Sequence, residues 1–151
     1  MRNRAGFTMI EIAVALTIVS LLVLIGIPRF NEAMAKQNVR GARTMLVNMV
    51  AKARAAATQT NRRTRLVGNG NRAWIVATPR AVFLAGSSFD TLGVVENLNS
   101  RYGVTLAVTN ADSIKFDPRG LSWNGIVDTM RMTKSGHTDW LAIDAMGRVT
   151  K

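Results

Sequence analysis

Cysteine is absent from this sequence of 151 residues, and histidine occurs once, as His137. Without cysteine the chain forms neither disulfides nor thiolate metal sites. A single imidazole also leaves no pair of histidines for a metal or for acid–base chemistry. His137 stands in a Ser-Gly-His-Thr stretch that is typical of a turn, so we expect an exposed loop residue rather than a ligand or a base.

Acidic residues are scarce as well, and they form no catalytic pattern. The chain carries nine Asp and Glu against 20 Lys and Arg, which gives a formal net charge of +11. Four aspartates fall at turn-like or strand-edge positions, where this residue commonly bonds its own backbone: Asp112, Asp117, Asp139 and Asp144. We therefore expect a protein that is not an enzyme and that holds no cofactor and no metal.

The positive charge is concentrated in one part of the chain. Residues 29–80 contain eleven basic residues and one acid, Glu32, whereas residues 81–151 contain seven of each sign. Such a region has the charge to meet anionic lipid headgroups, nucleic acid or acidic protein subunits.

One long apolar run is present, and it lies near the N-terminus. Residues 7–27 span 21 positions with a single charge, Glu11, and this is about the length that a helix needs to cross a bilayer core of roughly 30 Å. A carboxylate in such a segment costs on the order of 2.5–3.5 kcal/mol on insertion scales, so it needs a partner. If the chain is cut after Gly6, Phe7 gains a free amine that can neutralise Glu11 of the same or of a neighbouring subunit.

The arrangement of Gly6, Phe7 and Glu11 before an apolar helix resembles the prepilin leader of type IV pilins and pseudopilins. The resemblance implies cleavage between Gly6 and Phe7 by a prepilin peptidase, methylation of the Phe7 amine, and packing of the apolar helices of other pilin or pseudopilin subunits into a filament core. A secretory signal is the alternative, but its apolar region spans only about 7–15 residues. A plain membrane anchor gives no reason for Glu11.

The charges that flank this run conflict with the topology that the resemblance implies. Arg2 and Arg4 precede the run, and four basic residues follow it within residues 29–43, so the positive-inside tendency places the large domain in the cytoplasm. The resemblance implies instead a cytoplasmic leader, a single pass through the lipid of the bacterial inner membrane and a periplasmic C-terminal domain. We adopt the second topology.

The helical pattern continues over residues 28–60, because spanning helices tolerate a proline such as Pro28. At 100° per residue, five cations lie within about 60° of one another: Arg29, Lys36, Arg40, Arg43 and Arg54. Opposite them lie Met34, Ala42, Met45, Met49, Ala53 and Ala56. The pattern predicts an apolar face against a core and a basic stripe, which is either a solvated face or an anion-binding strip.

Residues 61–151 are typical of a small antiparallel β domain. Strands at residues 65–67 and 73–78 flank a Gly-Asn-Gly-Asn turn and predict a hairpin, in which we expect Trp74 to face the core. Further strands are expected at residues 102–108, 113–116, 129–133, 139–143 and 148–150, and residues 86–100 are typical of a loop.

The predicted fold class is α+β and pilin-like, a long N-terminal transmembrane helix packed on a small antiparallel β domain. The predicted divisions are a leader at 1–6, a membrane and filament-core helix at 7–27, an amphipathic continuation at 28–60 and a globular domain at 61–151.

Two turn motifs, at residues 116–120 and 143–149, resemble the GspH/FimT branch, which supplies a minor pseudopilin of type II secretion and minor pilins of type IV pili. DNA-uptake members of this branch end with Gly-Arg-x-Arg. Here Gly147 and Arg148 keep the first pair, Thr150 replaces the second Arg, and Lys151 follows. Arg148 and Lys151 therefore join the five cations of the helix as candidate DNA- or anion-binding residues, unless residues 147–148 simply end the last hairpin.

We therefore expect a minor pilin or pseudopilin, a structural subunit of a type II secretion pseudopilus or of a type IV pilus, within a periplasmic or cell-surface filament. The alternative is a DNA-binding minor pilin that acts in DNA uptake. A third hypothesis is an isolated, membrane-anchored periplasmic domain that never assembles.

Overall fold

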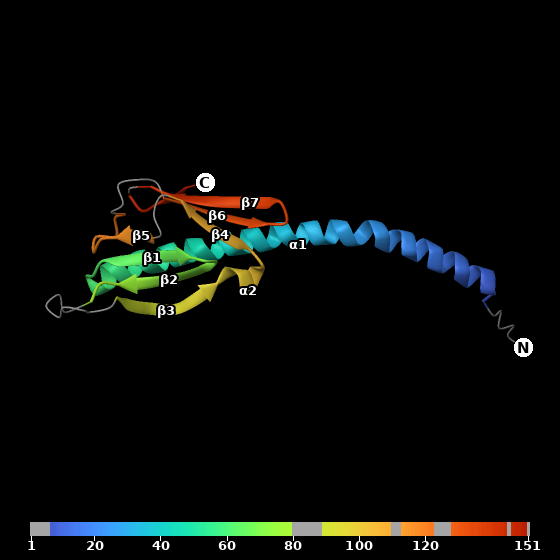
Figure 1. Ribbon diagram of the computed structural model, residues 1–151, viewed down its shortest axis with the longest axis horizontal. Coiled ribbons are helices and arrows are strands. Elements are labelled where there is room, and N and C mark those ends of the chain that lie inside the picture. Colours follow the sequence, from blue (N-terminus) through green and yellow to red (C-terminus); the bar gives the residue numbers. More distant parts are fainter. Residues whose placement is uncertain (1–6, 80–88, 110–112, 123–127, 145, 151) are drawn as a thin grey trace, which may run out of the picture. The chain divides into compact units, whose positions relative to one another are not determined.

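The computed structural model describes residues 7–79, 89–109, 113–122, 128–144 and 146–150. The chain divides into an N-terminal unit, Met1–Met34, and a C-terminal unit, Ala35–Lys151. One helix, α1 (Met9–Thr60), supplies residues to both units and continues past Pro28, as the sequence predicts (Figure 1).

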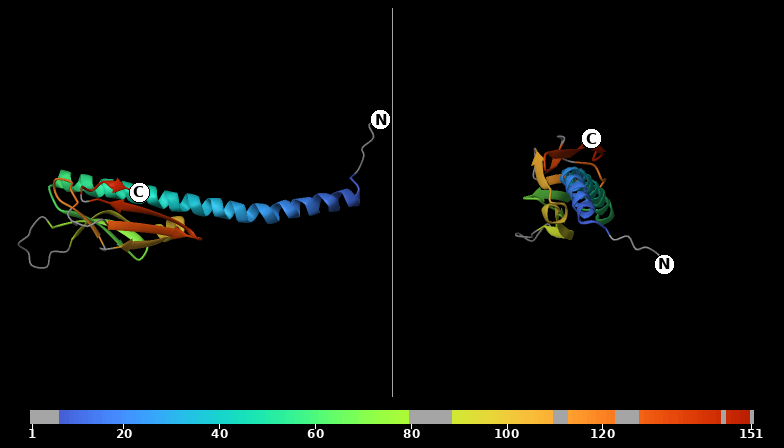
Figure 2. Two further views of the ribbon diagram at one scale, coloured as in Figure 1. Left: turned by 90° about the horizontal axis from the view of Figure 1, so that it is seen from above. Right: turned by 90° about the vertical axis from the view of Figure 1, so that its right-hand side faces the viewer.

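The C-terminal unit contains two antiparallel sheets. In the first sheet the strand order is β3 (Asp90–Asn97), β2 (Arg72–Ala77), β1 (Thr64–Asn69) and β5 (Ser113–Phe116). In the second sheet the order is β4 (Thr105–Thr109), β6 (Asp128–Lys134), β7 (His137–Ile143) and β8 (Val149–Thr150). Both sheets lie along residues 35–60 of α1 (Figures 1 and 2). The predicted α+β class, with a long N-terminal helix packed on an antiparallel β domain, is confirmed.

The β1–β2 hairpin forms where the sequence predicts it. Gly70 and Asn71 are its turn residues, with φ of 54° and 67°, the positive values that a tight two-residue hairpin turn requires. The register pairs Val67 with Trp74 and Asn69 with Arg72. The predicted strands at residues 113–116, 129–133, 139–143 and 148–150 are also present, with bounds that shift by at most two residues.

The prediction of a loop over residues 86–100 is wrong in the part that the structure describes, and residues 86–88 lie outside it. Residues 90–97 form β3, an edge strand that pairs with β2 across an irregularity between Ala73 and Ile75. Asn97 then caps a short helix, α2 (Leu98–Tyr102), because its side chain accepts hydrogen bonds from the N–H groups of Asn99 and Ser100.

The strand predicted at residues 102–108 begins later than expected. Tyr102 is the last residue of α2, and Gly103 follows it in the left-handed conformation, with φ of 63°, as helix C-caps commonly do. The strand β4 therefore starts at Thr105. The predicted start is wrong because Tyr102 and Gly103 form the C-terminal end of α2 and its cap, whatever their β propensity.

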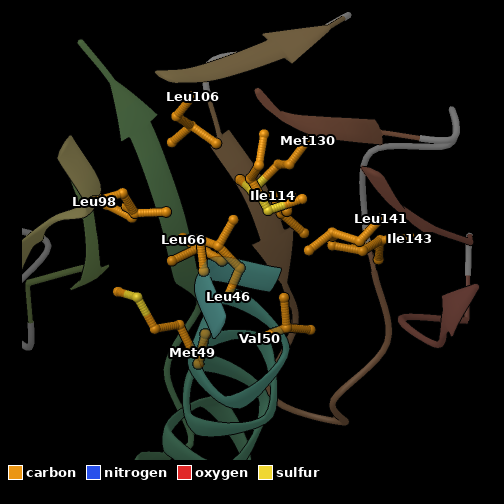
Figure 3. Packing of buried hydrophobic residues seen from close by; sticks show 14 of the residues in the cluster. Leu46, Met49, Val50, Leu66, Leu98, Leu106, Ile114, Met130, Leu141 and Ile143 are labelled. Atoms are coloured by element: carbon orange, nitrogen blue, oxygen red, sulfur yellow. The ribbon is translucent and has the colours of Figure 1, made fainter. Parts of the chain in front are cut away.

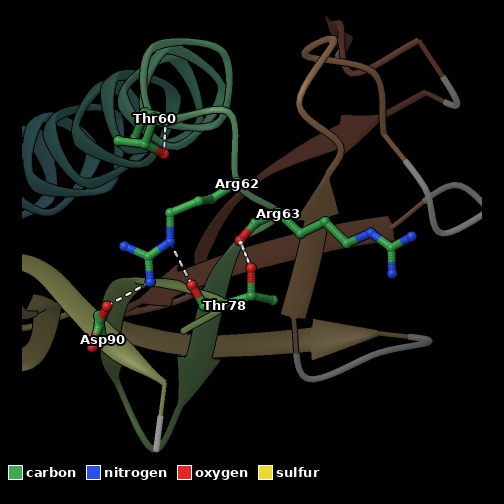
Figure 4. Close-up of polar contacts among 6 residues, drawn as sticks. Thr60, Arg62, Arg63, Thr78 and Asp90 are labelled. Carbon is green, nitrogen blue, oxygen red and sulfur yellow. Dashed lines mark hydrogen bonds and ion pairs between the residues drawn. The ribbon is translucent and has the colours of Figure 1, made fainter. Parts of the chain in front are cut away.

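The core of the C-terminal unit lies between α1 and the two sheets (Figure 3). The predicted apolar face of the helix is confirmed at Ala42, Met49 and Ala53, which are buried, but Met34 is 41% exposed and Met45 and Ala56 are only partly buried. Five further helix residues that the wheel did not select are buried: Ala35, Val39, Leu46, Val50 and Ala57. The buried face is therefore rotated from the predicted one, because contact with two sheets, not the helix pattern alone, selects it.

Trp74 does not belong to this core. Ala73 and Ile75 are the residues of β2 that belong to the core cluster with the helix, so strand alternation puts Trp74, which is half-buried, on the other face of the first sheet. The prediction that Trp74 faces the core is therefore wrong, because Ala73 and Ile75, its neighbours in the strand, are the residues that face it.

Candidate functional site

The first feature that bears on function is the surface of the N-terminal unit. Every described residue from Phe7 to Met34 is exposed, and Phe7 itself is 81% exposed. Among these residues α1 contains a stretch that is apolar enough and long enough to cross a membrane. A fully apolar helix surface is unfavourable in water, at about 25 cal/mol for each Å² left uncovered. Cover of this stretch by an apolar environment would remove that cost.

The start of α1 is a capping box, which the sequence reasoning missed. The Glu11 N–H donates to the Thr8 hydroxyl at 3.3 Å, and the Thr8 N–H donates to the Glu11 carboxylate at 3.4 Å. A Thr followed three residues later by Glu ahead of an apolar run is the signal that predicts this arrangement. The contact holds the Glu11 carboxylate against the amide that follows Phe7, while Gly6 lies outside the described residues.

The second feature is a pair of matching turns in the C-terminal unit. The carboxylate of Asp117 accepts hydrogen bonds from the N–H groups of Arg119 and Leu121 at 2.9 and 2.8 Å. The carboxylate of Asp144 does the same for the residues two and four positions later, Met146 and Arg148, at 3.0 and 2.7 Å. Each turn also has a glycine with positive φ, at residues 120 and 147.

The two turns pack against each other. A Cβ placed on Gly147 would lie 3.0 Å from a ring carbon of Phe116 and 3.4 Å from the carbonyl oxygen of Gly120. Gly147 is therefore required both by its φ of 73° and by the close approach of the first turn. The two motifs that the sequence analysis noted 27 positions apart thus form one structure, which we call the twin turns (residues 117–121 and 144–148).

A shallow groove of about 500 Å³ lies between α1 and the second of the twin turns. Apolar helix residues such as Val47, Val50 and Ala55 line it, together with two cations, Arg54 and Arg148. The first turn also approaches Arg54, because a Cβ on Gly120 would lie 3.1 Å from the Arg54 Nε. The structure therefore brings together two of the predicted DNA- or anion-binding residues that are far apart in the sequence.

Arg148 is partly neutralised where it stands. Its guanidinium donates to the Asp144 carboxylate at 3.0 Å. The backbone N–H of Arg148, with the guanidinium adding to it, lowers the pKa of Asp144 below the usual 3.8, against a smaller opposing effect of partial burial. Arg148 therefore keeps only part of its hydrogen-bonding capacity for an external anion.

The other predicted cations are not gathered at this groove. Arg43 lies 3.8 Å from the Asp139 carboxylate and donates to the Trp140 carbonyl oxygen at 3.3 Å, so it ties the helix to β7. Lys36 and Arg40 are exposed on α1 of the C-terminal unit, Arg29 belongs to the N-terminal unit, and Lys151 lies outside the described residues.

His137 is not the exposed loop residue that the sequence predicted. Ser135 and Gly136 form the turn, with φ of 47° and 80°, and His137 is the first residue of β7, half-buried opposite Lys134. Within the described parts of the chain, no group of three or more His, Cys, Asp or Glu side chains is placed to hold a metal ion.

Comparison with known proteins agrees with the N-terminal motif and with the fold. The prokaryotic N-terminal methylation motif matches residues 1–27. No curated protein sequence matches the chain. Two crystal structures of the type IV minor pilin FimU from Pseudomonas aeruginosa, in different crystal forms, have the same fold, with TM-scores of 0.58 and 0.57. Their sequences are 15% and 18% identical to this chain, and the matches cover 76% and 74% of it and 88% and 90% of FimU.

The chain therefore has a pilin-like fold and carries the N-terminal methylation motif. The predicted resemblance to pilins and pseudopilins is thereby confirmed. Within that class, the chain combines the N-terminal methylation motif with the fold of a minor type IV pilin.

Proposed function

We propose that the protein is a minor pilin or pseudopilin, a structural subunit of a type IV pilus or of a type II secretion pseudopilus. The observation that carries this proposal is a wholly exposed apolar helix surface that lies within the matched methylation motif, residues 1–27. A peptidase site followed by an apolar helix suits a subunit that is stored in lipid and later packed among like helices. We assign the protein no enzymatic activity.

The proposed mechanism begins with cleavage between Gly6 and Phe7 and methylation of the Phe7 amine. Residues 7–27 then anchor the subunit in the inner membrane, with the C-terminal unit in the periplasm. Transfer of the helix from lipid into a filament changes its apolar surroundings little, because lipid tails and neighbouring apolar side chains are alike. The filament is therefore reached from the membrane without a large hydrophobic penalty.

Glu11 supplies the register of this assembly. Its carboxylate is strongly unfavourable in an apolar filament core unless a cation compensates it, and the methylated Phe7 amine of a neighbouring subunit is the proposed cation. The capping box holds the carboxylate in place for that pairing, because it fixes Glu11 against the backbone of Thr8.

Two variants separate the charge of Glu11 from its capping role. Glu11→Ala removes both, whereas Glu11→Gln removes the charge and keeps an oxygen that can accept from the Thr8 N–H. We expect both variants to insert into the membrane and both to be lost from sheared filaments. If Glu11→Gln enters filaments normally, charge pairing is not the determinant of register, and if Glu11→Ala also does, the assembly role of Glu11 is wrong.

Mass spectrometry of the protein from its native membrane tests processing directly. The expected species begins at Phe7 and carries one extra methyl group. A chain that still bears residues 1–6 in cells with an active prepilin peptidase contradicts the proposal. A processed chain that never appears in filaments supports instead the isolated membrane-anchored domain.

Binding of double-stranded DNA is a second candidate function, favoured by the meeting of Arg54 and Arg148 at one groove. Lys36, Arg40 and Lys151 are further proposed contacts, whereas the ties of Arg43 to β7 and of Arg148 to Asp144 weaken the case. Full-length protein in detergent should bind duplex DNA with an affinity that falls steeply with salt, by a log–log slope of about 0.9 for each phosphate contact. Arg54→Gln with Arg148→Gln should reduce that slope by about two contacts, and absence of binding at low salt eliminates this function.

A further inference from the structure

The outer face of the first sheet has no role in the functions proposed above. Leu66, Ala73 and Ile114 are buried on its inner face, so the alternate residues of the three strands lie on the outer face. These are Arg65, Val67 and Asn69 of β1, Arg72, Trp74 and the buried Val76 of β2, and Ser113 and Lys115 of β5. Every charged side chain in β1, β2 and β5 is positive.

Trp74 lies on this face beside polar side chains that could bind a ligand. It lines an open cavity of about 490 Å³ with Asn69, Gly70, Arg72 and Val95. The ladder register places Asn69 directly opposite Arg72, two positions from Trp74 along β2. An indole ring thus lies beside a guanidinium and an amide, which are groups that donate hydrogen bonds to phosphate oxygens and to base edges.

Two cations on the same face stand in an unfavourable arrangement. Arg65 and Lys115 are directly opposite each other in the β1–β5 ladder, and like charges in that position are destabilising. The Arg65 guanidinium lies 4.6 Å from the ring centre of Phe89, which is 46% exposed. Neither cation has an acidic partner among the residues that the structure describes. An anion laid across the strands would relieve this repulsion.

We propose that the outer face of the first sheet binds single-stranded nucleic acid. The bases stack on Trp74, and the phosphates lie at Arg65, Arg72 and Lys115. Single strands suit such a surface because every unpaired base offers a π face to an aromatic ring, whereas a duplex hides its base faces. The proposal goes beyond the structural role, and its residues differ from those of the helix stripe and the tail.

The first test compares two probes on the full-length protein in detergent micelles at low salt. One is a fluorescently labelled oligothymidine, and the other is an abasic deoxyribose-phosphate chain of the same length and charge. We expect the oligothymidine to bind about 5- to 150-fold more tightly, the range that one stacked base contributes. Trp74→Leu should bring the two affinities together. Equal binding of the two probes by the unmodified protein overturns the proposal.

Trp74→Leu could also lose binding because it misfolds, and circular dichroism would reveal such a defect. Charge variants at the surface test the same site without this risk. Arg72→Gln and Lys115→Gln are surface changes, and each should lower the slope of log affinity against log salt by about 0.7. Arg131→Gln, an exposed cation on β6 of the other sheet, is the matched control and should change nothing. Arg54→Gln should also leave this binding intact, which separates it from duplex binding at the groove. Equal effects of Arg131→Gln and Arg72→Gln would reduce the interaction to net charge and refute the proposed site.

Discussion

The same helix behaves in opposite ways in the two units. In the N-terminal unit, the described residues of α1 are exposed all round, and nearly all of them up to Ile27 are apolar. In the C-terminal unit the helix is amphipathic, with eight residues buried on one face. A helix that is apolar on all sides requires a partner from outside the chain, whereas an amphipathic helix finds its partner in its own domain. Residues 35–60 of α1 are therefore stabilised by the fold of the chain itself, whereas residues 9–27 have no such partner among the residues that the structure describes.

The largest difference between the two units is expected when one leucine in each unit is truncated to alanine. Leu46 is fully buried in the C-terminal unit, and Leu24 is 72% exposed in the N-terminal unit. Leu46→Ala should lower the free energy of unfolding of the C-terminal unit by about 2–5 kcal/mol. Leu24→Ala should change it by less than about 0.5 kcal/mol. Tryptophan fluorescence during chemical denaturation in detergent measures both, and a loss of similar size in the two variants contradicts the separation of the units.

Glycine substitutions should have opposite signs in the two units. Gly147 has φ of 73° and lies against Phe116, whereas a Cβ on Gly26 in α1 meets nothing within 4 Å. Gly147→Ala should destabilise the C-terminal unit by about 1–3 kcal/mol, because alanine is strained in a left-handed conformation and the twin turns must separate.

Gly26→Ala should instead increase helix stability by up to about 1 kcal/mol, because alanine has the higher helix propensity. Thermal unfolding measures the first change, and hydrogen exchange of the helix amides measures the second. Destabilisation by Gly26→Ala would show that the N-terminal unit needs a close approach at this glycine within the single chain.

Two helix caps allow a smaller and more local test. Thr8 caps α1 in the N-terminal unit, and Asn97 caps α2 in the C-terminal unit. Substitution of either residue by alanine should destabilise the helix that it caps by about 0.5–2 kcal/mol. Thr8→Ala should speed hydrogen exchange in the first turn of α1 and leave the melting of the C-terminal unit unchanged, whereas Asn97→Ala should lower that melting temperature.

The smallest effect is expected from the Asp144 carboxylate of the second turn. Its pKa is lowered in the folded chain, mainly by the Arg148 backbone N–H. A lowered pKa means that its contribution to stability is fully present above about pH 3.8 and is lost as the pH falls through the lowered folded-state value. The free energy of unfolding of Asp144→Asn should therefore fall less than that of the unmodified protein as the pH is lowered below about 3.8. An NMR titration that places the Asp144 midpoint at or above 3.8 contradicts the turn geometry.

The sequence predicted the elements whose signals are local. The hairpin at Gly70 and Asn71 follows from turn chemistry, and the turn at residues 117–120 from an Asp-Pro-x-Gly pattern. Glu11 was singled out because a lone charge in an apolar run is conspicuous, although its contact with Thr8 was readable and was missed. The sequence does not predict the edge strand β3, because the interruption at Gly93 hides its apolar alternation.

The candidate sites in the C-terminal unit depend on contacts between distant parts of the chain. Arg43 meets Asp139 across 96 positions, and no pattern in the helix distinguishes this tied cation from the exposed Arg40. The outer face that carries Trp74 was misplaced, because the side of a strand that is buried depends on which neighbour approaches closely. Strand alternation allows both faces, and packing selects one.

By itself the sequence determined that this chain begins with a methylation motif and an apolar helix, followed by an antiparallel domain with tight turns. Those features arise from interactions within a few residues, which composition and spacing record. Only the tertiary structure decided that the twin turns pack together, that Arg54 and Arg148 share a groove, and that Trp74 faces outward among cations. These juxtapositions come from the joint packing of a helix and two sheets, and no local pattern contains that information.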